Sequence, residues 1–219
     1  MLEISAAIFD MDGTLVDSLM LWDVFANELA KRYPVKAGTV VSEEDSKLMR
    51  VLPLNAAMQI LHDHYGIGNS GEEVSAFAAE VFMDFYANRV ELKAGVLSFL
   101  SHLKERGVRM CIASATPLPL IEAALDHCGI RMCFEKIFSC ADIGKGKDAP
   151  DIYYMARDYF GGDASTTWVF EDSYVAVRTA VGVGMPTVGI YDRYNPYQDL
   201  IESLSTHYIA ADETLMKLV

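Results

Sequence analysis

The stretch Ala6-Ala7-Ile8-Phe9-Asp10-Met11-Asp12-Gly13-Thr14 decides the architecture of this 219-residue chain. An uninterrupted apolar run that ends abruptly in polar residues is typical of a parallel strand buried on both faces. Two carboxylates follow it, and open parallel sheets bind their ligands at the carboxyl ends of the strands. Gly13 allows the sharp turn by which the chain leaves the strand. The stretch therefore predicts an α/β fold with a metal and a nucleophile at Asp10 and Asp12.

The composition restricts the partners of the chain. The formal net charge is −13 and 52% of the residues are hydrophobic. An acidic chain is poorly suited to nucleic acid or to an anionic membrane, so neither is expected as a partner. It also repels a phosphorylated substrate at long range, unless a bound cation reverses the local field. A phosphate site in this chain therefore requires a metal.

Location and assembly follow from what the sequence lacks. It contains no apolar run long enough to span a bilayer and no N-terminal signal pattern. We therefore expect a cytoplasmic protein, and in such a compartment its four cysteines are not expected to form a disulfide framework. The sequence contains no heptad pattern that would indicate an oligomer, so a monomer is expected.

Two kinds of sequence pattern occur along the chain. Residues 1–16 and 92–219 read as strands alternating with helices, which predicts a parallel sheet. The strands are expected at residues 6–9, 108–113, 136–139, 167–170 and 187–191. Residues 17–91 show apolar residues at helical spacing and no convincing strand. They are expected to form a helical domain inserted into the α/β domain.

Two later segments carry groups suited to phosphate. Ser114 ends a predicted strand, where its hydroxyl and the N–H groups after it can hold phosphate oxygens at a helix start. An ordinary helix cap is the alternative. Lys147 lies in a glycine-bearing loop and offers a point charge for phosphate. A solvated surface lysine is the alternative there.

A third segment carries a second acidic pair. Glu171 and Asp172 follow the strand predicted at residues 167–170. Acids also favour helix N-termini, which is the alternative explanation. Mg²⁺, however, prefers hard oxygen ligands from one or two carboxylates. Asp10, Asp172 and the backbone carbonyl of Asp12 meet that demand, so we favour the metal.

Together these segments resemble the haloacid dehalogenase superfamily. Residues 10–14 match its first motif, DxDGT, and Ser114 matches the second. Lys147, before Asp-Ala-Pro-Asp at residues 148–151, matches the third motif, commonly GKPAPD, with Asp148 replacing the usual proline. Glu171 and Asp172 match the fourth. The resemblance implies a Rossmann-like parallel core, residues 1–16 and 92–219, and an α-helical cap, residues 17–91.

The resemblance also implies chemistry and roles. It suggests a Mg²⁺-dependent phosphatase that acts on a small phosphorylated metabolite, with sugar or polyol phosphates preferred, through an aspartyl-phosphate intermediate. The implied nucleophile is Asp10, and the implied acid and base is Asp12. The implied metal residues are Asp10, Asp12, Glu171 and Asp172, and the implied phosphate-binding residues are Ser114, Ala115 and Lys147. The cap candidates for substrate contact are Trp22 and Arg50, for which bundle core and a solvated helix arginine are the alternatives.

Other functions stay open at this point. A sugar-phosphate mutase resembling β-phosphoglucomutase shares the motifs, but such mutases typically carry a histidine where this chain has Trp22 and a lysine where it has Pro117. A family member that binds phosphate without catalysis is a further alternative. A receiver-type signalling domain also uses an aspartate and Mg²⁺, but it is shorter and places its acidic pair before the phosphoacceptor strand.

Overall fold

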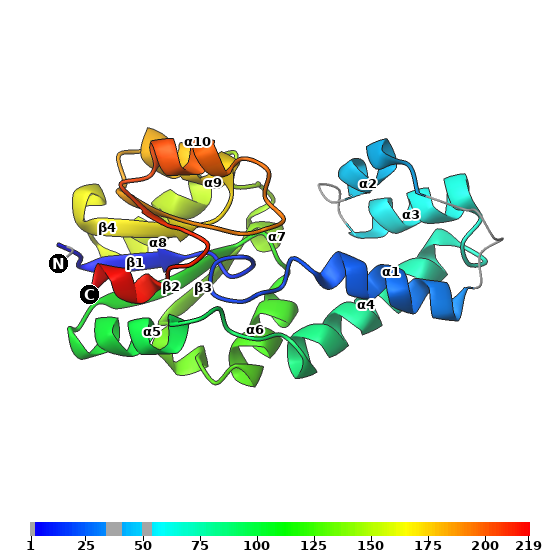
Figure 1. Ribbon diagram of the computed structural model, residues 1–219, viewed down its shortest axis with the longest axis horizontal. Coiled ribbons are helices and arrows are strands. Elements are labelled where there is room, and N and C mark those ends of the chain that lie inside the picture. Colours follow the sequence, from blue (N-terminus) through cyan, green and yellow to red (C-terminus); the bar gives the residue numbers. More distant parts are fainter. Residues whose placement is uncertain (1–2, 34–40, 50–53) are drawn as a thin grey trace. The chain divides into compact units, whose positions relative to one another are not determined.

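The computed structural model describes residues 3–33, 41–49 and 54–219. Its six-stranded sheet has the order β3-β2-β1-β4-β5-β6, and every neighbouring pair is parallel (Figure 1). The strands are β1 (Ala6–Phe9), β2 (Arg109–Ser114), β3 (Lys136–Ser139), β4 (Thr167–Glu171), β5 (Thr187–Ile190) and β6 (His207–Ile209). The predicted parallel α/β fold is therefore confirmed.

Helices connect the strands and form the inserted segment. The α-helices are α1 (Leu21–Arg32), α2 (Glu43–Met49), α3 (Leu54–Tyr65), α4 (Gly71–Asn88), α5 (Val96–Glu105), α6 (Leu118–His127), α7 (Cys140–Ile143), α8 (Asp151–Phe160), α9 (Tyr174–Gly182) and α10 (Gln198–Leu204). The short 3₁₀ turns among the described residues are η1 (Arg131–Cys133), η2 (Ala164–Thr166) and η3 (Leu215–Leu218).

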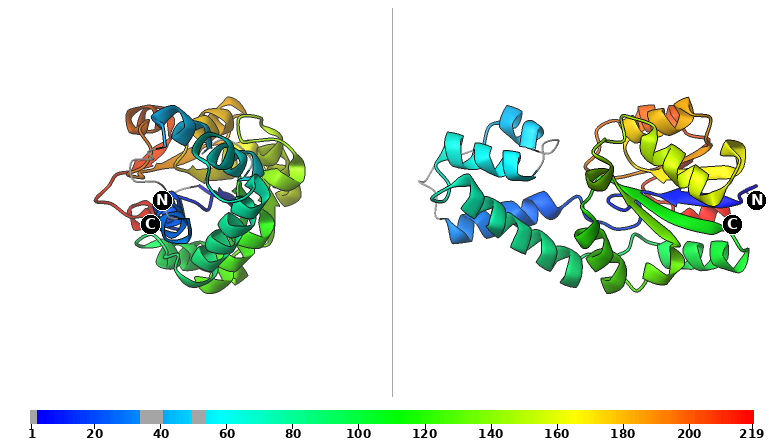
Figure 2. Two further views of the ribbon diagram at one scale, coloured as in Figure 1. Left: turned by 90° about the vertical axis from the view of Figure 1, so that its right-hand side faces the viewer. Right: turned by 180° about the vertical axis from the view of Figure 1, so that it is seen from behind.

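Successive side chains of β1 point to opposite faces of the sheet, and all of them are buried. Ile8 belongs to a buried cluster with residues of α8 and α9, including Ile152 and Ala176. Phe9 stacks on Phe170 of β4 and meets Phe99 of α5 edge-on. Helices α8 and α9 thus cover one face and α5 the other, as both views of the sheet show (Figures 1 and 2). This two-sided burial explains the uninterrupted apolar run.

Apart from the 3₁₀ turns, three of the described elements have no counterpart in the sequence-based expectations. Strand β6 lies at the sheet edge, and of its three residues only Ile209 is buried. It therefore lacks the apolar run by which a strand is recognised. Helix α10 precedes it. Helix α7 is a single turn, in which the Ser139 hydroxyl accepts from the Ala141 N–H and Gly144 ends the helix in a left-handed conformation.

The contacts divide the chain into two compact units. One comprises the residues up to Leu19 together with Tyr86–Val219, and the other is Met20–Phe85. The second unit is helical, and aromatic side chains of α1 and α4 pack together in it, among them Phe25 and Phe82 with ring centroids 5.6 Å apart. Among the described residues, no helix combines the length and the apolar character needed to cross a bilayer.

Candidate active site

The site begins with Asp10, directly after β1. Its N–H donates to the carbonyl of Phe170 in β4 at 3.0 Å, so the chain still follows the sheet at this point. Strand β1 pairs with β2 on one side and β4 on the other, and the direction of winding reverses here. A crevice opens at such a reversal in parallel sheets. Because the strands are parallel, the ends of β2 and β4, with Ser114 and Glu171, lie at the same edge of the sheet as Asp10.

Lys147 reaches Asp10 from the loop between α7 and α8. Its ammonium donates to Asp10 Oδ1 at 2.5 Å and to Glu171 Oε1. Burial by itself would lower the pKa of Lys147, but the two carboxylates hold it well above its ordinary value. Lys145 instead pairs with Asp151 near the surface. Of the two lysines in this loop, the structure thus brings Lys147 to Asp10.

Three carboxylates gather at the same edge. Oxygens of Asp10, Glu171 and Asp172 lie within 4.8 Å of one another, and all three residues are buried. Burial raises the pKa of both Asp10 and Asp172, and repulsion among the carboxylates raises them further. Lys147 offsets the charge of only one carboxylate. The cluster therefore favours an additional cation.

The donor set fits Mg²⁺, which prefers hard oxygen ligands. The two oxygens of Glu171 already accept hydrogen bonds, from Lys147 and from the Ser173 N–H at 3.0 Å. Asp10 and Asp172 are therefore the side chains best suited to contact the ion directly. Glu171 is better suited to hold Lys147 in place.

The turn after β1 leaves room for Asp172. Gly13 has a φ of +79°, a left-handed conformation that favours glycine. A Cβ at this position would lie 2.5 Å from Asp172 Oδ2, so a side chain would displace the carboxylate. The next residue, Thr14, donates its hydroxyl to Asp172 Oδ1 at 3.4 Å. Gly13 and Thr14 thus shape the position of Asp172.

The Asp12 side chain does not belong to the three-carboxylate cluster found among the described residues. Its Oδ1 accepts from the hydroxyls of Ser18 at 2.5 Å and Tyr86 at 2.7 Å, and its Oδ2 accepts from Thr116 at 2.6 Å. Burial and the Asp12 carboxylate raise the pKa of Tyr86 well above its ordinary value, so the phenol stays a donor. Any metal role of Asp12 therefore falls to its backbone carbonyl.

The three hydroxyl residues around Asp12 were not anticipated from the sequence. Thr116 follows Ser114 by two residues, so its position near the strand ends could have been inferred. Ser18 and Tyr86 carry no such signal. Ser18 lies before α1 and Tyr86 near the end of α4, and nothing in their local sequence distinguishes them from other polar residues.

The remaining predicted residues occupy different places. Ser114 is buried at the end of β2 and its hydroxyl accepts from the Thr116 N–H at 3.1 Å, but it does not cap α6, whose N-cap is Pro117. Ala115 is exposed in the bend before α6. The ring of Trp22 is half-buried and meets Phe82 edge-on at 5.7 Å inside the helical unit. Arg50 lies outside the described residues.

Fold and site together define a class: a parallel α/β protein with a buried aspartate at the end of its central strand, a lysine in contact with it and an acidic cluster beside it. The chain belongs to the haloacid dehalogenase-like hydrolase family, whose model matches residues 4–184. The resemblance drawn from the four motifs is therefore confirmed, and so is the expectation of a hydrolase.

Relatives can be named individually. The chain is 28% identical over 98% of its length to a bifunctional riboflavin kinase/FMN phosphatase of Arabidopsis thaliana, of which it spans only 54%. It is 23% identical to a phosphorylated carbohydrates phosphatase of Thermotoga maritima, over 96% of each chain. The crystal structure of CbbY from Rhodobacter sphaeroides in complex with phosphate shares the fold, with a TM-score of 0.76, 21% identity and coverage of 94% of this chain and 93% of that one.

Proposed function

We propose that this chain is a Mg²⁺-dependent phosphatase that hydrolyses the monoester of a small phosphorylated metabolite, a sugar or polyol phosphate. The observation that carries the proposal is the environment of Asp10, which is buried at the end of β1 in contact with Lys147 and within a cluster of three carboxylates. The names of the two relatives support it, since both include phosphatase activity and one specifies phosphorylated carbohydrates.

In the first step, a carboxylate oxygen of Asp10 attacks phosphorus and the bond between phosphorus and the ester oxygen breaks. Asp12 gives its proton to the leaving oxygen, which departs as an alcohol. The product on the enzyme is an acyl phosphate of Asp10, so one difficult displacement is divided into two easier ones. Lys147, which donates to Asp10, is placed to neutralise charge on the transferring phosphoryl group.

In the second step, Asp12 takes a proton from water, and the oxygen of that water attacks phosphorus. The bond between phosphorus and the Asp10 oxygen breaks, which releases inorganic phosphate and restores the carboxylate. The same residue therefore serves as acid and then as base. The hydroxyls of Ser18, Tyr86 and Thr116 keep its carboxyl group in one orientation for both transfers.

The attacking group must be ionised in a buried site. Burial raises the pKa of the Asp10 carboxyl, while Lys147 opposes that shift. Asp10, Asp172 and the backbone carbonyl of Asp12 would hold Mg²⁺. When bound, the ion supplies the positive charge that keeps Asp10 ionised and offsets the charge of the phosphoryl oxygens.

The sugar-phosphate mutase is the less favoured alternative. Pro117 stands at the start of α6, where the mutases carry a lysine, and so it provides no ammonium for a second phosphate. Trp22, in place of their histidine, packs among the aromatic rings of the helical unit. These two positions support hydrolysis over transfer to a second sugar hydroxyl.

The test measures release of inorganic phosphate from a panel of phosphorylated metabolites, with Mg²⁺ and with a chelator. We expect metal-dependent multiple turnover on one class of sugar or polyol phosphates, and none with Asp10→Asn, which keeps the shape of the side chain. The matched control is Asp126→Asn, an exposed position on α6 that should keep full activity. Turnover by Asp10→Asn near the wild-type rate would refute the mechanism. No release by a folded, Mg²⁺-bound protein would favour the mutase or a non-catalytic member.

A further inference from the structure

The segment after β5 folds around the buried side chain of Asp192. Its Oδ1 accepts from the Tyr194 N–H at 2.9 Å, and its carbonyl accepts from the Asn195 N–H at 3.0 Å. The Gln198 amide also donates to that carbonyl, at 2.6 Å. These bonds form a turn of the kind that Asp and Asn side chains stabilise by bonding to backbone two residues on. The turn is thus held in one conformation.

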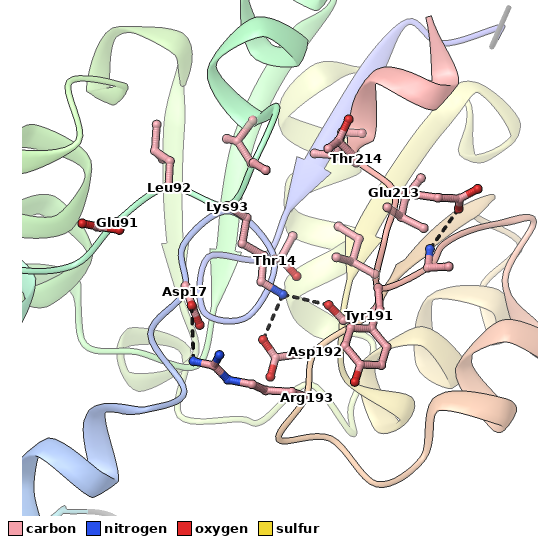
Figure 3. A pocket seen from close by; sticks show the side chains of 17 residues that line it. Thr14, Asp17, Glu91, Leu92, Lys93, Tyr191, Asp192, Arg193, Glu213 and Thr214 are labelled. Atoms are coloured by element: carbon pink, nitrogen blue, oxygen red, sulfur yellow. Dashed lines mark hydrogen bonds and ion pairs between the residues drawn. The ribbon is translucent and has the colours of Figure 1, made fainter.

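Lys93 holds the same turn from a distant part of the chain. Its ammonium pairs with Asp192 Oδ2 at 2.9 Å and donates to the Tyr191 carbonyl at 2.8 Å (Figure 3). The backbone N–H of Lys93 donates to the Leu15 carbonyl at 2.9 Å, in the segment that follows the first motif. Lys93 therefore joins the turn after β5 to the loop after β1, the loop that carries Asp10 and Asp12.

Lys93 and Asp192 line a pocket of about 300 Å³ (Figure 3). Thr14 lines the same pocket and donates its hydroxyl to the carboxylate of Asp172. The ion pair therefore lines the same pocket as Thr14, the hydrogen-bond donor to Asp172. The turn is close enough to the cluster to act on it directly.

The direct contact is made by Asn195. Its amide nitrogen donates to the backbone carbonyl of Asp172. Its amide oxygen accepts from the Tyr197 N–H at 3.0 Å, which fixes the amide with the nitrogen toward Asp172. Asp172 is thus held twice, by Thr14 at its side chain and by Asn195 at its backbone.

We propose that Asn195, oriented by the turn that Lys93 and Asp192 hold together, is a positioning residue that sets the Mg²⁺ affinity of the site through the backbone of Asp172. The inference rests on the proposed function, because it requires that the carboxylate cluster bind Mg²⁺. The role is indirect, because the Asn195 amide bonds to the backbone carbonyl of Asp172 and not to its carboxylate. Asn195 acts by holding Asp172 where its carboxylate meets that of Asp10.

The physical reason lies in the crowding of the cluster. Three buried carboxylates repel one another. Without a hydrogen bond that fixes its backbone, Asp172 would turn away from Asp10 and the ligand oxygens would separate. A metal site needs its ligands held to within about 0.5 Å by surrounding hydrogen bonds. Loss of such supporting bonds typically lowers metal affinity roughly 10- to 100-fold.

The test compares the Kd for Mg²⁺, measured by isothermal titration calorimetry, of the wild type and Asn195→Ser. A serine hydroxyl can still accept from the backbone N–H two residues on, as Asn195 does, but it is too short to reach the Asp172 carbonyl. We expect the Kd to rise roughly 10- to 100-fold, while the melting temperature of the metal-free protein changes little. Asn195→Ala should raise the Kd at least as much.

Two controls separate this role from general loosening. Gln198→Ala removes bonds to the same turn without touching Asp172, and it should raise the Kd less than Asn195→Ser. Asn55→Ala, at an exposed position of α3, should leave the Kd unchanged. A wild-type Kd in Asn195→Ser overturns the inference but leaves the proposed metal site standing. So does a rise in the Kd of Gln198→Ala equal to that of Asn195→Ser. A wild-type protein that binds no Mg²⁺ overturns the proposed metal site and the inference with it.

Discussion

The hydroxyl of Tyr86 offers a sharp test of how Asp12 works. Tyr86 lies near the end of α4 and donates to Asp12 Oδ1 at 2.7 Å from an almost fully buried position. Tyr86→Phe removes that oxygen and keeps the ring, so it creates no sizeable cavity. If Asp12 must be held in one orientation to move its proton, the variant should lose turnover without losing its fold.

The size of the effect follows from the contacts of Asp12. A hydrogen bond to a charged group contributes about 1.5–3 kcal/mol, which corresponds to a loss of about 10- to 150-fold in kcat/KM. Ser18 still donates to the same oxygen at 2.5 Å, and Thr116 to the other at 2.6 Å. Two of three donors remain, so we expect a loss near the lower limit, about tenfold.

The assay is kcat/KM for phosphate release from the preferred substrate, with unfolding curves for each variant. Tyr33→Phe is the matched control, because that phenol also donates to a carboxylate, Glu73 at 2.8 Å, but within the helical unit. We expect it to leave kcat/KM unchanged. Wild-type kcat/KM in Tyr86→Phe, or an equal loss in both variants, would refute the reasoning.

Further predictions concern the cluster around Asp10. Gly13→Ala should weaken Mg²⁺ binding in calorimetry, since the new Cβ would lie 2.5 Å from Asp172 Oδ2, whereas Gly107→Ala imposes a similar left-handed strain with no atom within 4 Å and should bind normally. Lys147→Met should lower the free energy of unfolding by about 3–5 kcal/mol, because it leaves Asp10 and Glu171 buried without their cation. Lys145→Met, which breaks a surface pair, should cost roughly 0–1 kcal/mol in the same denaturant titration. Burial raises the pKa of Asp10 from 3.8 to about 8, so between these values the folded chain binds a proton that the unfolded chain has lost. The metal-free protein should therefore lose stability as the pH rises from about 4 to about 8, and Mg²⁺ should remove the loss. Denaturation curves at about pH 6 and about pH 8 check this, and equal or greater metal-free stability at the higher pH would contradict it.

Much of the fold could be predicted because its strands carry local signals. The apolar run of β1 is explained by helices on both faces of the sheet, with Ile8 toward α8 and α9 and Phe9 toward α5. β6 escaped prediction because it is a three-residue edge strand with one buried residue. Burial on two faces leaves a pattern in the sequence, whereas an exposed edge does not.

Lys147, rather than Lys145, was identified by its match to the third motif. The sequence by itself also determined which residues stand at the strand ends, and so it brought out Asp10, Glu171 and Asp172. Parallel strands deliver whatever follows them to one edge of the sheet, so motif order alone suffices for these residues. Only the tertiary structure decided what surrounds them. The donors to Asp12 lie 6, 74 and 104 residues away in the chain, and Asn195 lies 23 residues from Asp172. Such contacts depend on how separate loops meet in space, and no local spacing encodes that.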